Sequence, residues 1–91
     1  KTEFKSIFPN PFNPSTQISY SLCKTEDVKF YVYNKRGQLV RSFDLGTRNA
    51  GEWRQTWDGK DTDGRSVASG LYLIRMQAGK DSFTRKAILQ K

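Results

Sequence analysis

Apolar and polar residues alternate in short runs along this chain, and residues typical of turns separate the runs. Gln17–Leu22, for example, places Ile18, Tyr20 and Leu22 on one side and two serines on the other. A period of two is the pattern of a β-strand with one buried face. Similar runs predict further strands at Phe4–Phe8, Val28–Asn34, Gln38–Asp44, Glu52–Trp57, Leu71–Gln77 and Ser82–Leu89.

No window of the chain shows the apolar spacing of an amphipathic helix. About seven short strands separated by turns predict an all-β, immunoglobulin-like antiparallel β-sandwich. A turn at Gly79-Lys80 joins the last two strands into a hairpin, and it places Arg85 on the apolar face of that hairpin. Either Arg85 lies near the rim of the core or the register of the hairpin is shifted.

The strand predicted at Gln38–Asp44 is less regular than the others. Strict alternation places Leu39, Arg41 and Phe43 on one side and Val40 on the other. Both sides carry an apolar residue, so the pattern predicts a strand without choosing its inner face.

Two loops are more specific than simple turns. Phe8–Pro14 contains three prolines, which lack amide donors and cannot belong to a central strand. We expect a stiff, extended arm with Phe8 and Phe12 available to pack into the sandwich. The segment Trp57–Gly70 alternates Asp and Gly, which predicts two consecutive tight turns with Val67 as a buried pin between them.

The aromatic residues have two interpretations. Trp53 and Trp57 share one face of a predicted strand, which favours positions in the core. Planar side chains on a β-sandwich can instead bind sugar rings, which makes a carbohydrate-binding module an alternative hypothesis. Its candidate residues are Trp53, Trp57, Tyr31, Tyr33 and Tyr72.

The 91 residues suffice for one domain. Neither a signal peptide nor an apolar stretch of the ~18 residues needed by a transmembrane segment is present in this sequence. The chain begins at Lys1, which favours a module cut from a longer protein. Cys23 is the single cysteine, so it forms no internal disulfide, and we expect it to act as a small buried or half-buried hydrophobic residue.

The formal net charge is +7, with basic residues spread along the whole chain. An anionic partner such as nucleic acid, lipopolysaccharide or another anionic surface is one interpretation, and a solvated basic surface is the other. No nucleic-acid-binding motif is present, and we expect no binding to nucleic acid.

The residue types also restrict the chemistry. The absence of histidine excludes Ser-His-Asp and Cys-His nucleophile arrangements and most zinc sites, so we expect no enzyme activity. Asp58, Asp61 and Asp63 form a calcium candidate because alternating oxygen ligands are typical of calcium loops. The bidentate Glu that closes an EF-hand loop is missing, which favours side-chain-capped turns and no cofactor.

The sequence resembles a known family over nearly its whole length, from about Phe8 to Lys91. The run Phe8–Thr16 followed by Ile18–Leu22 resembles the opening of C-terminal sorting domains of the bacterial type IX secretion system. The same pattern occurs in the FlgD-like immunoglobulin-like domain family, named after the flagellar hook-capping protein. The resemblance continues through Trp57–Asp61, Val67–Tyr72 and Arg85–Lys91. A proline commonly follows the leucine that ends the second strand, and Cys23 stands there instead.

The resemblance implies a non-catalytic C-terminal sorting signal of a secreted protein from Bacteroidetes-type bacteria. Such a domain passes through the periplasm, is recognised by the outer-membrane translocon, and reaches the cell surface or the medium. A sortase-like cysteine peptidase removes it, and the upstream cargo domain is joined to anionic lipopolysaccharide. Residues 1–7 would then end the linker from the cargo, and residues 8–91 would form the sorting domain. By resemblance, translocon recognition falls on Gly70, Leu71, Tyr72, Arg75, Lys86, Ala87, Ile88, Leu89 and Lys91.

A structural role is the alternative. An immunoglobulin-like spacer or assembly module, as in hook-capping proteins or at the end of secreted hydrolases, needs no translocon. In either case the last predicted strand would be an edge strand, and its backbone could pair with a partner strand.

Overall fold

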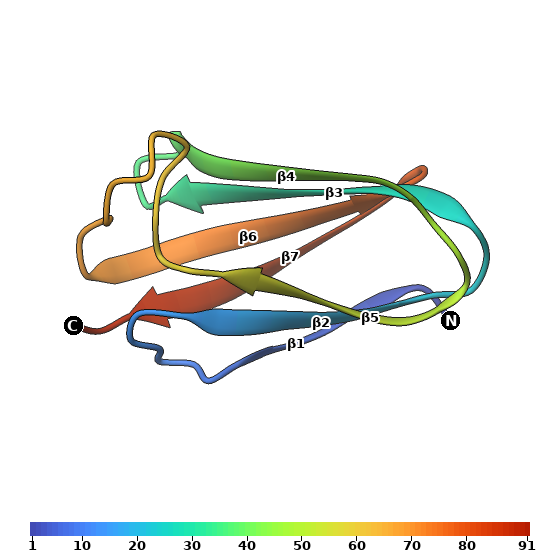
Figure 1. Cartoon of the computed structure of the whole chain (residues 1–91), viewed down its shortest axis with the longest axis horizontal. Coiled ribbons are helices and arrows are strands. Elements are labelled where there is room, and N and C mark those ends of the chain that lie inside the picture. Colours follow the sequence, from blue (N-terminus) through green and yellow to red (C-terminus); the bar gives the residue numbers. More distant parts are fainter.

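A computed structural model describes all residues from Lys1 to Lys91. The chain forms two antiparallel sheets packed face to face, with strand orders β1-β2-β5 and β4-β3-β6-β7 (Figure 1). The seven strands are β1 (Glu3–Phe8), β2 (Thr16–Leu22), β3 (Glu26–Asn34), β4 (Leu39–Arg48), β5 (Gly51–Trp57), β6 (Gly70–Ala78) and β7 (Asp81–Leu89). The predicted all-β immunoglobulin-like sandwich of about seven strands is confirmed. No segment forms a helix with the length and hydropathy needed to cross a bilayer.

Aromatic rings fill the space between the two sheets. The Phe30 ring packs edge-on against Phe4 and Tyr20, at centroid distances of 5.8 and 5.0 Å. Trp57 is completely buried, and the rings of Phe12 and Tyr72 pack around it at centroid distances of 5.4 and 5.3 Å. Aromatic pairs at these distances add to the free energy gained from their buried area. A chain with only 35% hydrophobic residues can thereby close a core.

The first strand belongs to the folded unit. β1 pairs with β2, and Phe4 and Ile7 lie in the core. Thr2 is also nearly buried, and its hydroxyl oxygen accepts a hydrogen bond from the Cys23 amide over 3.0 Å. The structure therefore corrects the boundary expected from the sequence, because residues 3–7 form part of the sandwich and not a linker.

Two side chains differ from their predicted burial at this end of the chain. An irregularity in β1 between Phe4 and Ser6 shifts the alternation, so that Ile7 faces the core and Phe8 is 76% exposed. Of the two arm phenylalanines, only Phe12 packs into the sandwich. Cys23 is exposed in the turn after β2, so the prediction of a buried or half-buried residue is wrong.

The inner face of β4 is set by a bulge. Tyr33 pairs with Leu39 and Val32 pairs with Arg41, so Val40 is an extra residue without an opposite partner. A bulge turns the strand locally. As a result Val40 packs against the core with Phe43, whereas Leu39 is 55% exposed. Strict alternation placed Leu39 and Phe43 on the same side of the strand, and the bulge puts them on opposite sides.

The β6–β7 hairpin has the register predicted for a turn at Gly79-Lys80, because Ala78 pairs with Asp81. Arg85 lies at the rim of the core, which resolves the alternative that the sequence left open. Its Nε donates a 2.7 Å hydrogen bond to the carbonyl of Phe4, and its guanidinium lies 5.7 Å from the centre of the Phe4 ring. Arg85 thus links β7 to β1 across the two sheets.

Candidate functional site

The outward side chains of three adjacent strands form an apolar and basic surface. We define the outer face as Tyr31 and Tyr33 on β3, Leu71, Leu73 and Arg75 on β6, and Lys86 and Ile88 on β7. Leu71 pairs with Ile88, and these two side chains are 37% and 44% exposed. The next pair is Leu73 with Lys86, and Tyr33 lies opposite Leu73 on the other side.

The residues predicted for translocon recognition divide between the core and the surface. Tyr72, Ala87 and Leu89 are buried, with exposed fractions of 5%, 0% and 1%, because they alternate inward. The Tyr72 hydroxyl also donates a 2.6 Å hydrogen bond to the carbonyl of Ala68. The remaining members are exposed or half-buried: Gly70, Leu71, Arg75, Lys86, Ile88 and Lys91. Only this second group can contact a partner of the folded domain.

Arg75 lies against the surface of the sheet. Its guanidinium is 5.7 Å from the centre of the Tyr31 ring, and its Nη2 donates a 2.7 Å hydrogen bond to Gln77 Oε1. The Nε of Arg75 is buried without a hydrogen-bond partner. Stacking and the hydrogen bond to Gln77 therefore hold this cation against the outer face.

β7 is an edge strand of its sheet, as predicted, but its C-terminal half is covered. The Phe12 amide donates to Ile88 O over 2.8 Å, and the Gln90 amide donates to Phe12 O over 2.9 Å. The Asn10 side chain donates from Nδ2 to Lys86 O and accepts at Oδ1 from the Ile88 amide. The arm residues Asn10 and Phe12 thus occupy the backbone edge over residues 86–90.

Over residues 86–90 the arm thus occupies the backbone edge that we expected a partner strand to be able to use. The proline-rich arm joins β1 to β2 at the end of the sandwich where the chain ends (Figure 1). A partner must therefore use the outer face, or it must displace the arm. The sequence indicated a stiff arm, but it did not identify Asn10 as the residue that attaches the arm to β7.

The three aspartates of the calcium candidate do not form a metal-ligating group. Asp61 Oδ1 accepts hydrogen bonds from the amides of Asp63 and Arg65, at 3.0 and 2.9 Å. Asp58 Oδ1 accepts from the Lys60 amide at 3.1 Å and from Arg41 Nη1 at 3.2 Å. These are the side-chain-capped turns that the alternation of Asp and Gly favoured.

The aromatic candidates for sugar binding lie in three different places. Trp57 and Tyr72 belong to the core, and Trp57 Nε1 donates to Lys60 O over 3.0 Å. Tyr31 and Tyr33 lie on the outer face with ring centres 6.5 Å apart. Trp53 is half-buried at an open side of the sandwich. The five side chains therefore form no common binding platform.

Comparison with known sequences points to one family. The FlgD Ig-like domain matches residues 14–82. The basal-body rod modification protein FlgD of Salmonella typhimurium is 43% identical over 47 residues, which is 52% of this chain and 20% of that protein. The chain thus spans about a fifth of the length of this relative.

Solved structures show the same fold. PorU from Porphyromonas gingivalis superposes with a TM-score of 0.77 at 21% identity, over 92% of this chain and 9% of that protein. FlgD from Pseudomonas aeruginosa superposes with a TM-score of 0.66 at 29% identity, over 81% of this chain and 57% of that protein. PorZ, a surface component of the type IX secretion system of P. gingivalis, superposes with a TM-score of 0.66 at 18% identity, over 94% of this chain and 11% of that protein. With a match of this extent to its sequence and fold, the chain belongs to the FlgD Ig-like domain family.

Proposed function

We propose that this domain is a non-catalytic docking module of a longer secreted protein, an assembly domain of the hook-capping type. The outer face carries the proposal. Leu71 and Ile88 form an exposed apolar pair on a sheet surface, where an antiparallel sandwich ordinarily presents polar side chains to water. Apolar residues that group together on a surface are a mark of protein interaction sites.

The surroundings of that pair suit protein docking. Lys86 lies opposite Leu73 and places a positive charge next to the apolar pair. Further along the same face, Arg75 packs on Tyr31, and Tyr33 adds aromatic area. Aromatic side chains and arginine are enriched in the centres of protein interfaces. The strands beneath are paired by backbone hydrogen bonds on both sides of β6, so little order has to be gained when a partner binds.

A second candidate function is sorting through the type IX translocon. The observation in its favour is that six of the residues implied by the sorting-domain resemblance remain accessible, and three of them, Leu71, Lys86 and Ile88, adjoin one another on the outer face. The fold shared with PorZ, a component of that system, agrees with this proposal. In this case the partners are the outer-membrane translocon and a sortase-like cysteine peptidase. The cargo would pass through the periplasm to the surface and be joined to anionic lipopolysaccharide.

Substitutions on the outer face test both functions without disturbing the core. Deleting Ala87–Lys91 would remove two buried side chains, Ala87 and Leu89, and would confuse loss of folding with loss of docking. Ile88→Asp changes an exposed residue instead. Phe8→Asp is the matched control, because Phe8 is an exposed apolar residue away from the outer face.

The experiment uses the full-length parent protein and a reporter fused to residues 1–91, each expressed in a host with type IX machinery and in one without it. Docking of the assembly type predicts that Ile88→Asp prevents co-purification of the parent protein's partners, with export unchanged. Sorting predicts that Ile88→Asp retains the reporter in the periplasm of the type IX host, with Phe8→Asp exported normally. If the folded Ile88→Asp protein assembles and is exported like the wild type, both proposals are wrong.

A further inference from the structure

The two flanks of the sandwich are closed to different extents. Between β7 and β1, the arm and the hydrogen bond from Arg85 to Phe4 connect the sheets. Between β4 and β5, the loop after Trp57 closes only one end, where the Thr62 amide donates to Val40 O over 3.0 Å. The other end, next to the β4–β5 connection, holds an open pocket of about 360 Å³.

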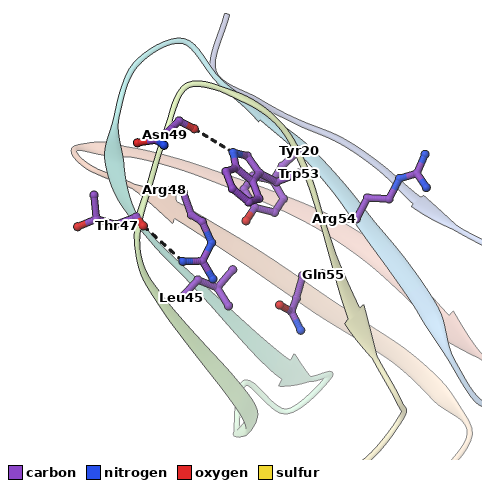
Figure 2. Close-up of a pocket in the computed structure, with 8 residues that line it drawn as sticks. All are labelled: Tyr20, Leu45, Thr47, Arg48, Asn49, Trp53, Arg54 and Gln55. Atoms are coloured by element: carbon purple, nitrogen blue, oxygen red, sulfur yellow. Dashed lines mark hydrogen bonds between the residues drawn. The ribbon is translucent and has the colours of Figure 1, made fainter.

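Five of the eight residues that line this pocket are polar or charged, and none carries a carboxylate. Leu45 and Arg48 line it from β4, and Trp53 and Gln55 line it from β5 (Figure 2). Arg48 and Gln55 lie on opposite sides of the space, whereas Arg54 points away from its centre (Figure 2). The pocket therefore presents one cation, aromatic surface and neutral hydrogen-bonding groups.

The aromatic and cationic groups are held in place before any ligand arrives. Trp53 Nε1 donates a 2.9 Å hydrogen bond to the carbonyl of Asn49. The Arg48 guanidinium lies 5.5 Å from the centre of the Trp53 ring, and its Nη1 donates to Thr47 O over 3.3 Å. Stacking and hydrogen bonding reduce the rotamer freedom that binding would otherwise cost.

Tyr20 places its hydroxyl at the bottom of the same pocket. The side chain is almost entirely buried and lies next to Trp53 on the neighbouring strand (Figure 2). Burial raises the pKa of Tyr20, and the nearby Arg48 opposes this effect by favouring the phenolate. The phenol is neutral at physiological pH and can donate or accept a hydrogen bond.

We propose that this pocket binds a short acidic carbohydrate, a sugar chain that carries carboxylate groups. A carboxylate pairs with the Arg48 guanidinium, and sugar hydroxyls bond to Gln55 and to the Tyr20 hydroxyl. Trp53 supplies the apolar surface for a sugar ring. The volume lies within the range of small-ligand pockets in proteins, about 300–1,000 Å³. This site lies apart from the outer face and does not depend on the proposed docking function.

An acidic peptide is the alternative ligand that could pair with Arg48. Peptide-binding grooves take side chains into apolar pockets. Here only three lining residues are hydrophobic, and the groups around Arg48 are an amide, a phenol and an indole. Neutral hydrogen-bonding groups beside an aromatic ring suit hydroxyl-rich ligands better.

Titration calorimetry of residues 1–91 tests the proposal, with oligogalacturonate as the probe. A neutral galacto-oligosaccharide of equal length and an acidic peptide of equal charge are the comparison ligands. We expect saturable binding of oligogalacturonate only. Arg48→Gln should weaken it about tenfold or more, which corresponds to about 1.4 kcal/mol or more, because a charge-assisted hydrogen bond to the carboxylate is lost.

Two further variants separate a specific pocket from general attraction to a basic protein. Arg36→Gln removes the same charge from an exposed loop position outside the pocket and should leave the affinity within about twofold. Gln55→Glu adds a carboxylate opposite Arg48 and should abolish binding while the melting temperature is kept. Equal losses from Arg48→Gln and Arg36→Gln, equal affinity for the neutral sugar or the peptide, or no saturable binding would each overturn the proposal.

Discussion

Asn10 and Ile88 are joined by a hydrogen bond from the Ile88 amide to Asn10 Oδ1, 2.9 Å long. The Nδ2 of the same side chain donates to Lys86 O over 3.0 Å. One carboxamide thus satisfies a donor and an acceptor on the edge of β7. The arm uses a side chain here in the way that a neighbouring strand uses its backbone, and the sheet edge over residues 86–90 is covered without an eighth strand.

Asn10→Ala should lower the free energy of unfolding by about 1–3 kcal/mol, because two hydrogen bonds of roughly 0.5–1.5 kcal/mol each are lost. Urea denaturation measures this change. Asn13→Ala is the matched control, since Asn13 lies in the same arm and its side chain makes no hydrogen bond within the protein. Equal effects of the two substitutions would show that Asn10 does not attach the arm.

The two arm phenylalanines should differ sharply on truncation. Phe12 is 2% exposed and packs on Trp57, so Phe12→Ala should cost about 3–5 kcal/mol. Phe8 is 76% exposed, and Phe8→Ala should stay within about 0.5 kcal/mol. Thermal and chemical unfolding of both variants measures the difference. A small cost for Phe12→Ala would mean that the arm does not contribute to the core.

Gly59 has two reasons to remain glycine. Its φ is +73°, and a Cβ would lie 2.6 Å from the Pro14 carbonyl oxygen. Gly64 has a similar φ of +81° but open space around it. Gly64→Ala should therefore cost only the roughly 1–2 kcal/mol of a left-handed backbone conformation. Gly59→Ala should cost clearly more in the same denaturation assay, and similar costs would contradict the close approach of the two loops.

Calcium should leave the melting temperature unchanged, and so should a chelator. Asp61 Oδ1 already accepts two backbone amides, and Asp58 pairs with Arg41. Asp61→Ala should lower the free energy of unfolding by about 1 kcal/mol or more through loss of the two hydrogen bonds. Asp63→Ala, whose carboxylate makes no hydrogen bond in the protein, should have a smaller effect. A rise in melting temperature with calcium would restore the metal-site hypothesis.

Stability should fall at alkaline pH. Burial raises the pKa of Tyr20 and of Tyr72 above 10.0, the value for an exposed tyrosine. Above pH 10.0 the unfolded chain loses these protons first, so it binds fewer protons than the folded state. The contribution of these two tyrosines to the free energy of unfolding is therefore fully present below that pH. It is lost as the pH rises through the pKa values of the folded state.

Denaturation across this pH range, combined with ultraviolet titration of the phenolates, tests the assignment. Tyr20→Phe should make the decline with pH shallower than in the wild type, because one group with a raised pKa is removed. An unfolding free energy that stays constant past pH 10.0 would contradict the burial of both hydroxyl groups.

The alternation of apolar residues determined the fold class and most of the strands by itself. An apolar residue at every second position indicates a strand with one buried face. The local sequence therefore identifies the core residues of two strands, which are Ile18, Tyr20 and Leu22 in β2 and Val28, Phe30 and Val32 in β3. The same rule separates Tyr72, Ala87 and Leu89 from Leu71, Lys86 and Ile88 on the final hairpin. The sequence resemblance had grouped all six as a recognition signal, and their alternation shows which ones point outward.

Only the tertiary structure decided the features that join distant segments. The bulge at Val40, the shift of alternation in β1 and the attachment of Asn10 to β7 depend on the partner strand and not on local sequence. The pocket beside Trp53 arises because β4 and β5 lie in different sheets and leave one flank open. Alternation specifies which side chains face inward, but the pairing of strands determines where two sheets meet and where they leave a gap.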